Sequence, residues 1–305
     1  MRKRVFPLLT FPTLILALVA MALVPLSASA ATSSTSAYSS HHKAHFFLKK
    51  DLRRHNASPL ASGSNLVYGG GPVMGGTTNA YAIFWEPTGN VSANYNSLIE
   101  RYFGDVGGSP LYNNNTQYTD SAGNVPSNTV LAGAWVDTSP YPESPLLDSD
   151  IQNEVTNAQN ANGWSSSIDN IFFVFTEAGQ DICFDSSFSQ CASNTFCAYH
   201  NFFGSDTIYA AMPYAASFSC NPGSSPNNDD ADQTINVTSH EQMEAATDPL
   251  LNAWTDSSGN EIGDKCAWMF GPLDANGGDV VWNGDEYIVQ QEWDNNVSGC
   301  VLSGP

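Results

Sequence analysis

The chain has 305 residues, of which 42% are hydrophobic and 11% aromatic, enough to bury a substantial core in one or two domains. The formal charge is −20, and beyond Arg54 two basic residues face twenty-nine acidic ones, a formal charge of −27 for residues 55–305. Such a surface repels phosphate backbones, which argues against a nucleic-acid partner.

The first thirty residues predict a secretory signal peptide. Basic residues at positions 2–4 precede a long apolar run that contains three prolines and ends at the small residues 28–30. An uncleaved membrane anchor is the alternative, but the prolines and the small-residue end favour cleavage after Ala30. No later segment is long and apolar enough to span a bilayer, so we expect a secreted, extracellular protein without a membrane partner.

Residues 31–64 predict a flexible leader or propeptide ahead of a single acidic globular domain at residues 65–305. This leader is rich in serine, contains the basic stretch KKDLRR and carries four histidines: His41, His42, His45 and His55. A histidine-rich tract can bind metal, but the composition favours a solvated arm.

From Tyr68 onward, expected strands alternate with expected helices. A glycine-rich turn, YGGGPVMGG, comes first, without the preceding strand and following helix that a phosphate loop needs. The expected strands are 78–85, 128–137, 168–176 and 207–215, and the expected helices are 91–106, 146–163 and 232–247. This order predicts an α/β fold with a mostly parallel central sheet and flanking helices.

Six cysteines, all in the second half, predict three disulfides in an exported chain. Six cysteines allow fifteen pairings. Closure between neighbours gives the pairs that we expect: Cys183–Cys191, Cys197–Cys220 and Cys266–Cys300. A thiolate metal site is the alternative, which the lack of a Cys-x-x-Cys pair disfavours.

The stretch SHEQMEAATDP, residues 239–249, carries the strongest chemical signal. On a helix, His240 and Glu244 leave the same face one turn apart, so that both can bind one cation. Glu241 follows His240 at the place where the glutamate of His-Glu-x-x-His metalloproteases takes a proton from the metal-bound water. We therefore predict a metal site with Glu241 as general base. The alternative is an acidic, solvated helix that happens to carry a histidine.

A further protein ligand is needed to complete such a site. Asp264 is the first choice and Glu261 the second, because both lie in a loop just before a disulfide-forming cysteine. Asp248 is another candidate, or else it caps the helix end at Pro249. His200, in FCAYH, is either a distant ligand or transition-state donor, or a structural residue.

We expect a divalent metal, with zinc as the first choice. Two carboxylates and one imidazole also suit harder cations such as manganese or calcium. A calcium or carbohydrate site in DSSGNEIGD, residues 256–264, is a weaker possibility because that loop lacks the regular oxygen spacing of a calcium hand.

Residues 68–266 resemble the exordium / phosphate-induced protein 1 family, and in particular its microbial secreted branch with a Ser-His-Glu-x-x-Glu-Ala-x-Thr-Asp-Pro signature. The motifs that carry the resemblance are YGGGPVMGGTTNAYAIFW, FCAYH, YAAMPYA and SHEQMEAATDP followed by GNEIGDKC. Plant members, tied to cell-wall growth, lack the histidine and glutamates of this helix but keep a counterpart of FCAYH. The resemblance therefore implies that His200 is structural.

The order of elements also resembles the catalytic half of zincin metallopeptidases, in which an edge strand binds an extended peptide by strand addition. By this analogy, residues 207–215 are the edge strand. The main hypothesis is a secreted, monomeric, zinc-dependent hydrolase that cleaves extracellular peptides or proteins. The alternative is a non-catalytic exordium-like protein of the cell surface or cell wall, with a structural metal or none.

Overall fold

The computed structural model describes residues 44–52 and 64–305. The predicted signal peptide and most of the predicted leader lie outside the described residues. The chain divides after His41, and every element described below belongs to the unit that follows. No helix among the described residues is long and apolar enough to cross a bilayer.

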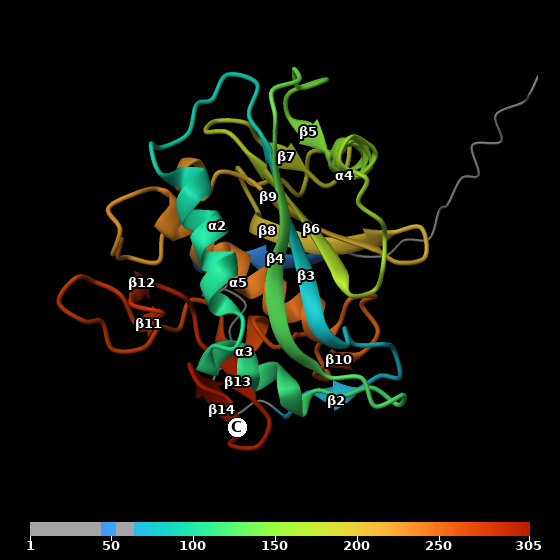
Figure 1. The fold of residues 1–305 in the computed structure, drawn as a ribbon, viewed down its shortest axis with the longest axis vertical. Helices are drawn as coiled ribbons and strands as arrows, with labels where there is room; N and C mark the ends of the chain where they lie inside the picture. The colour runs from blue at the N-terminus through green and yellow to red at the C-terminus, as the bar shows by residue number, and fades with distance from the viewer. Residues whose placement is uncertain (1–43, 53–63) are drawn as a thin grey trace, which may run out of the picture. The chain divides into compact units, whose positions relative to one another are not determined.

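A six-stranded sheet forms the centre of the domain, in the order β1-β8-β9-β6-β3-β4 (Figure 1). Its strands are β1 (His45–Leu48), β3 (Gly76–Trp85), β4 (Pro126–Asp137), β6 (Asn170–Thr176), β8 (Phe196–Phe203) and β9 (Thr207–Met212). Strands β4, β3, β6 and β9 are parallel, while β8 runs antiparallel to both of its neighbours, β9 and β1. The predicted mostly parallel α/β sheet is confirmed.

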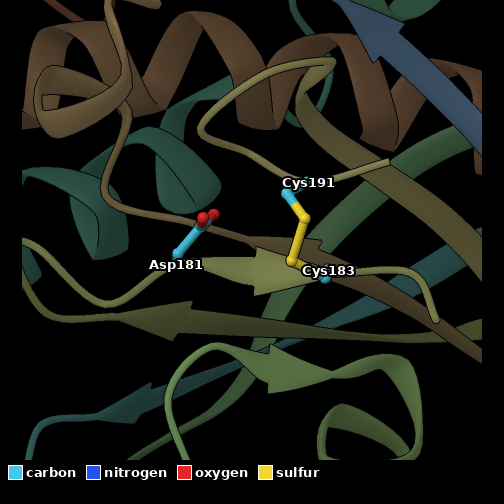
Figure 2. Close-up of side chains that lie close together, drawn as sticks. All are labelled: Asp181, Cys183 and Cys191. Carbon is cyan, nitrogen blue, oxygen red and sulfur yellow. A yellow bond between two sulfur atoms is a disulfide. The ribbon is translucent and has the colours of Figure 1, made fainter. Parts of the chain in front are cut away.

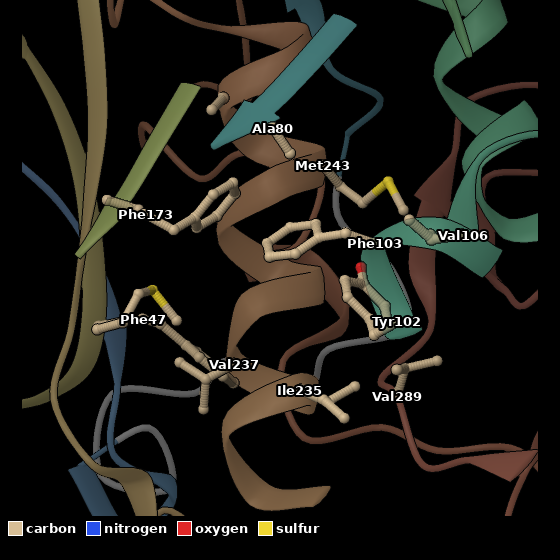
Figure 3. Close-up of a cluster of buried hydrophobic side chains, with 14 of the residues drawn as sticks. Phe47, Ala80, Tyr102, Phe103, Val106, Phe173, Ile235, Val237, Met243 and Val289 are labelled. Atoms are coloured by element: carbon tan, nitrogen blue, oxygen red, sulfur yellow. The ribbon is translucent and has the colours of Figure 1, made fainter. Parts of the chain in front are cut away.

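Helices cover both faces of the sheet. The central strand β6 has apolar side chains on both faces, and each face has to be buried under helices. Phe173 belongs to the core under α2 (Tyr95–Val106) and α5 (Ala231–Thr247), whereas Phe172 belongs to the core under α4 (Asp148–Asn162). Figure 3 shows Phe103 of α2 and Phe173 meeting beside α5. A strand that is buried on both faces is typical of the centre of a parallel sheet.

The remaining elements are short. The paired strands are β2 (Val67–Tyr68) with β10 (Trp254–Thr255), β5 (Leu146–Leu147) with β7 (Ile182–Cys183), β11 (Val280–Trp282) with β12 (Asp285–Tyr287), and β13 (Glu292–Asp294) with β14 (Gly299–Val301). The short helical turns are α3 (Pro110–Asn113), η1 (Asn114–Gln117), η2 (Ala215–Phe218) and η3 (Asp264–Cys266). Disulfides join Cys183 to Cys191, Cys197 to Cys220 and Cys266 to Cys300, the pairs expected from closure between neighbours.

The predicted edge strand is wrong. Residues 207–212 form β9, which lies between β6 and β8 rather than at the edge. The reason is a hairpin: FCAYH begins β8, and Gly204 at φ +65° turns the chain back into β9. Within the predicted leader, His45–Leu48 form β1 on the outer edge of β8.

Helix α5 differs from an ordinary surface helix in that both of its faces are buried. Of its seventeen residues, sixteen are buried, and His240, Glu241 and Glu244 have no exposed surface. Burying an ionised carboxylate is costly unless it is paired or bound to a cation. The interpretation of this helix as an acidic, solvated one is therefore wrong, and its polar residues require partners inside the domain.

Candidate metal centre

The first two candidate ligands come from α5. His240 and Glu244, one turn apart, lie on the same face, with His240 Nε2 3.1 Å from Glu244 Oε1. The Gln290 amide nitrogen lies 3.0 Å from His240 Nδ1 and donates to the carbonyl of Gly263 at 2.9 Å, which fixes the plane of the imidazole. The helix therefore presents this pair in the arrangement that its spacing predicts.

His200 reaches the same site from β8, which packs on α5. Its Nδ1 lies 3.1 Å from Glu241 Oε2 and 3.7 Å from Glu244 Oε2, and its Nε2 lies 3.6 Å from Glu261 Oε2. The ring is fully buried. The resemblance to plant exordium proteins implied a structural histidine, but here its imidazole lies among three of the carboxylates that the sequence singled out.

The loop that precedes Cys266 supplies the next two acids. The backbone N–H of Asp264 donates to Glu244 Oε1 at 2.9 Å, and the side chains of Glu261 and Asp264 are both buried. Gly263 makes this approach possible, because a Cβ there would lie 2.6 Å from His240 Nδ1 and 3.1 Å from Glu244 Oε1. The disulfide at Cys266 holds the end of the loop.

His45 of β1 is the member of the site that sequence reasoning missed. Its Nε2 is in close contact with Asp264 Oδ2, and its Nδ1 lies 3.3 Å from Glu261 Oε1. Its Nε2 also lies 3.9 Å from Glu244 Oε2. The available signal was the apolar run FFL directly after a histidine-rich tract, but the composition of the predicted leader concealed it.

Two sets of three side chains could each hold a cation, and they share Glu244. The sets are His200, Glu244 and Glu261, and His45, Glu244 and Asp264; within each, one potential ligand atom per residue lies within 4.8 Å of the others. A third group, Asp181 with Cys183 and Cys191, is not a metal site, because the two sulfur atoms are joined in a disulfide (Figure 2). His240 belongs to neither set but contacts their shared carboxylate.

Asp248 takes the capping position that its sequence context offered. Its Oδ1 accepts hydrogen bonds from the backbone N–H groups of Asn252 and Ala253, both at 2.6 Å, which turns the chain after α5. Burial raises the pKa of Asp248 to about 6. It belongs to neither set of candidate ligands.

Burial and crowding set the protonation of the site. Burial, followed by the neighbouring carboxylates, holds the pKa values of Glu241, Glu261 and Glu292 well above their usual range. Burial, followed by the neighbouring imidazoles, holds the pKa of His200 well below its usual value, so its imidazole is neutral. Burial lowers the pKa of His45, but Asp264 and Glu244 outweigh this effect and raise it to about 9.

Several buried polar atoms at the centre have no hydrogen-bond partner within the described residues. They are His200 Nε2, His240 Nε2, Glu241 Oε1, Glu244 Oε2, Glu261 Oε2 and Glu292 Oε2. Native interiors leave few such atoms unsatisfied, and a cluster of them calls for a missing ion or water. Neutral imidazoles and carboxylate oxygens are the donors that divalent metals accept, so the residues present fit a cation.

Comparison with known proteins supports the exordium-like family. Protein EXORDIUM-like 5 of Arabidopsis thaliana is 24% identical to this chain over an alignment that covers 84% of this chain and 83% of the relative. No protein-family model and no solved structure matches the chain. The relative's name states no reaction.

Proposed function

We propose that this chain is an extracellular exordium-like protein that binds one divalent cation in a buried histidine–carboxylate centre. The observation that carries the proposal is the set of buried, unsatisfied nitrogen and oxygen atoms around Glu244. Within the described residues, Glu241, Glu244 and Glu261 lie within 4 Å of histidine nitrogens and form no ion pair with a lysine or arginine. A bound cation would supply the missing positive charge. The three disulfides fit an oxidising, extracellular compartment.

Glu244, His200 and Glu261 are the ligands that we propose first. All three are fully or almost fully buried, and each has an atom without a hydrogen-bond partner. His240 and Asp264 lie next to Glu244 and would complete or support the shell. Zinc is the first cation to test, because borderline metals accept imidazole and carboxylate together, with manganese as the comparison.

Glu241 has a contact that suggests a role other than that of a general base. Its Oε2 lies 3.1 Å from Nδ1 of His200, while His200 Nε2 on the far side of the ring has no hydrogen-bond partner. Metal-bound histidines commonly donate their other ring N–H to a carboxylate, which fixes the tautomer and the ring orientation. We propose that Glu241 orients His200 in this way.

The test of cation binding compares two Glu→Gln variants. Glu244→Gln removes a carboxylate from both candidate sets, whereas Glu143→Gln alters an exposed side chain and is the matched control. We expect Zn²⁺ affinity, measured by competition with a chelating dye, to fall about 100-fold or more for Glu244→Gln and to stay unchanged for the control. Equal Zn²⁺ affinity in Glu244→Gln and the native protein would contradict the proposal.

A metal-dependent peptidase is the second candidate, and the layout of α5 favours it. The helix carries His240, Glu241 and Glu244 in the spacing of a zincin-like helix, with a glutamate in place of the second histidine. The metal would supply Lewis acidity, and Glu241 would take the proton of the attacking water.

Glu241→Gln separates the two roles of this residue. If Glu241 is a general base, the variant keeps Zn²⁺ affinity and loses cleavage of a peptide library. If Glu241 orients His200, Zn²⁺ affinity falls by about 10–100-fold. A variant that binds Zn²⁺ and cleaves peptides like the native protein would remove Glu241 from both schemes.

A further inference from the structure

Strand β1 lies along the outer edge of β8, next to the candidate metal centre. It pairs antiparallel with β8, with His45 opposite His200 and Phe47 opposite Ala198, and the Lys49 amide N–H continues the contact by donating to the Thr195 carbonyl at 3.1 Å. An extended peptide that binds a sheet by strand addition makes the same backbone contacts. The sheet edge beside the centre is therefore filled by a segment of the chain's own leader.

The side chains of β1 enter the domain as those of a bound peptide would. Alternate residues of a strand point to the same face, so His45 and Phe47 both face α5. His45 contacts the carboxylates of the centre, and the ring of Phe47, fully buried, stacks on His240 at 3.9 Å between ring centroids and on Trp268 at 4.7 Å. The Trp268 indole N–H donates to the Leu48 carbonyl at 3.0 Å.

A cavity of about 490 Å³ adjoins β1 on the side of the metal centre. Ala44, His45, Phe46 and Leu48 line one part of it, and the loop from Ser258 to Glu261, together with Asp264, lines another. His45, Glu261 and Asp264 thus border both the cavity and the candidate centre. Departure of His45 would connect the two.

We propose that β1 is the built-in occupant of a peptide-binding cleft, and that the cleft binds an extended peptide with histidine and, two residues later, phenylalanine. The histidine would meet Glu261 and Asp264, and the phenylalanine would fill the aromatic slot between His240 and Trp268. This inference rests on the proposed function only in that a cation bound at the centre would accept the neutral imidazole of the histidine as a further ligand. The backbone ladder and the aromatic slot do not depend on the cation.

One feature makes β1 separable from the domain, and another indicates the charge of the peptide that the cleft binds. β1 is an edge strand of four residues, so its departure breaks the ladder on one side of β8 and leaves the other five strands paired. It is followed by Lys49 and Lys50, whereas residues 55–305 carry a formal charge of −27. The ligand class that matches the cleft is accordingly a short basic peptide with the His-x-Phe pattern.

The test uses the full chain and a labelled peptide, AHFFLKK, which copies residues 44–50. In the double variant His45→Ala/Phe47→Ala, β1 competes poorly for its own cleft, and we expect fluorescence anisotropy to report at least tenfold tighter peptide binding than in the native protein. Glu143→Gln, which alters an exposed side chain outside β1 and the cleft, is the control and should bind the peptide like the native protein. A peptide with both key residues replaced by alanine should not bind.

A second measurement covers the case in which the double variant unfolds. Trypsin can cut the chain after Lys49 or Lys50 and so separate β1 from the rest of the domain. Beyond Arg54 the sequence has only two other trypsin sites: Arg101, which forms an ion pair with Asp285 at 2.9 Å, and the buried Lys265. An excess of AHFFLKK should then release the fragment that contains β1, as seen by gel filtration and mass spectrometry. No peptide binding by a folded double variant, or a fragment that excess peptide never displaces, overturns the proposal.

Zn²⁺ stoichiometry measured in the same samples separates this inference from the proposed function. Peptide binding that persists in a chelator, with no Zn²⁺ bound at any concentration, would support the cleft and contradict the metal centre. Zn²⁺ binding in the native protein, without peptide binding to the folded double variant, would support the metal centre and contradict the cleft.

Discussion

Gly263→Ala tests how tightly the loop packs on the candidate centre. The new methyl group would lie 2.6 Å from Nδ1 and 2.9 Å from Cε1 of His240, and 3.1 Å from Oε1 of Glu244. Gly263 itself has ordinary helical dihedrals, φ −75° and ψ −41°, so alanine adds no backbone strain. The whole effect is therefore steric, and the imidazole cannot move away without losing its contact with Gln290.

The expected size of this effect follows from two opposing terms. Overpacking a filled interior costs about 1–3 kcal/mol. Replacing glycine with alanine reduces the entropy of the unfolded chain and returns about 0.4–1 kcal/mol. We expect Gly263→Ala to lower the free energy of unfolding by about 1–2 kcal/mol and to weaken Zn²⁺ binding, because His240 is displaced from Glu244.

Gly104→Ala is the matched control for this substitution. Gly104 lies inside α2, and a Cβ there would meet no atom within 4 Å. Alanine should therefore raise the free energy of unfolding by about 0.5–1 kcal/mol. Urea unfolding followed by tryptophan fluorescence measures both variants. The reasoning is refuted if Gly263→Ala is as stable as the native protein and binds Zn²⁺ equally well.

Two further predictions concern the stability of the folded domain. Burial, together with the charge of Asp137, raises the pKa of Glu154 from 4.5 to about 8, so the folded state keeps a proton that the unfolded chain loses. The stabilising contribution of this proton is complete below pH 4.5 and is lost as pH rises to 8, with a slope of up to about 1.4 kcal/mol of unfolding free energy per pH unit. Glu154→Gln should remove this slope. Urea midpoints that change in parallel for the two proteins from pH 5 to pH 8 would contradict the prediction. Replacing Cys266 and Cys300 with alanine opens a 34-residue loop, which should lower the free energy of unfolding by about 3–4 kcal/mol and weaken Zn²⁺ binding. An unchanged urea midpoint would contradict this prediction.

Local patterns in the sequence predict much of the fold and part of the candidate site. The helix expected at 232–247 is α5 at 231–247, because apolar spacing and the stop before Pro249 are local signals. The pair of His240 and Glu244 follows directly from helix geometry. The disulfides needed a further assumption, closure between neighbours, which local spacing does not require.

Contacts between distant segments were beyond such reasoning. His45 pairs with His200 across 155 residues of sequence, and four residues of strand give no periodic signal strong enough to outweigh a Ser-rich, basic surrounding. The edge position of β9 was predicted wrongly because the order of strands in a sheet depends on tertiary pairing, which the sequence of a single strand does not specify.

The burial of α5 was hidden for a related reason. Its polar residues, among them Glu241, are typical of a solvent-exposed face when the sequence of the helix is considered alone. In the fold, β1, β8 and the loop at Gly263 bury this face. Such disagreements between local pattern and tertiary structure are expected where function places charge in the interior. Here the disagreement falls on the proposed metal centre.

An anomalous difference map from crystals grown with Zn²⁺, recorded at the zinc absorption edge, tests the central claim most directly. The account predicts one strong peak with a carboxylate oxygen of Glu244 and a nitrogen of His200 at about 2.0–2.2 Å. The account is contradicted if the map has no peak at Glu244, or if zinc lies only on the acidic surface.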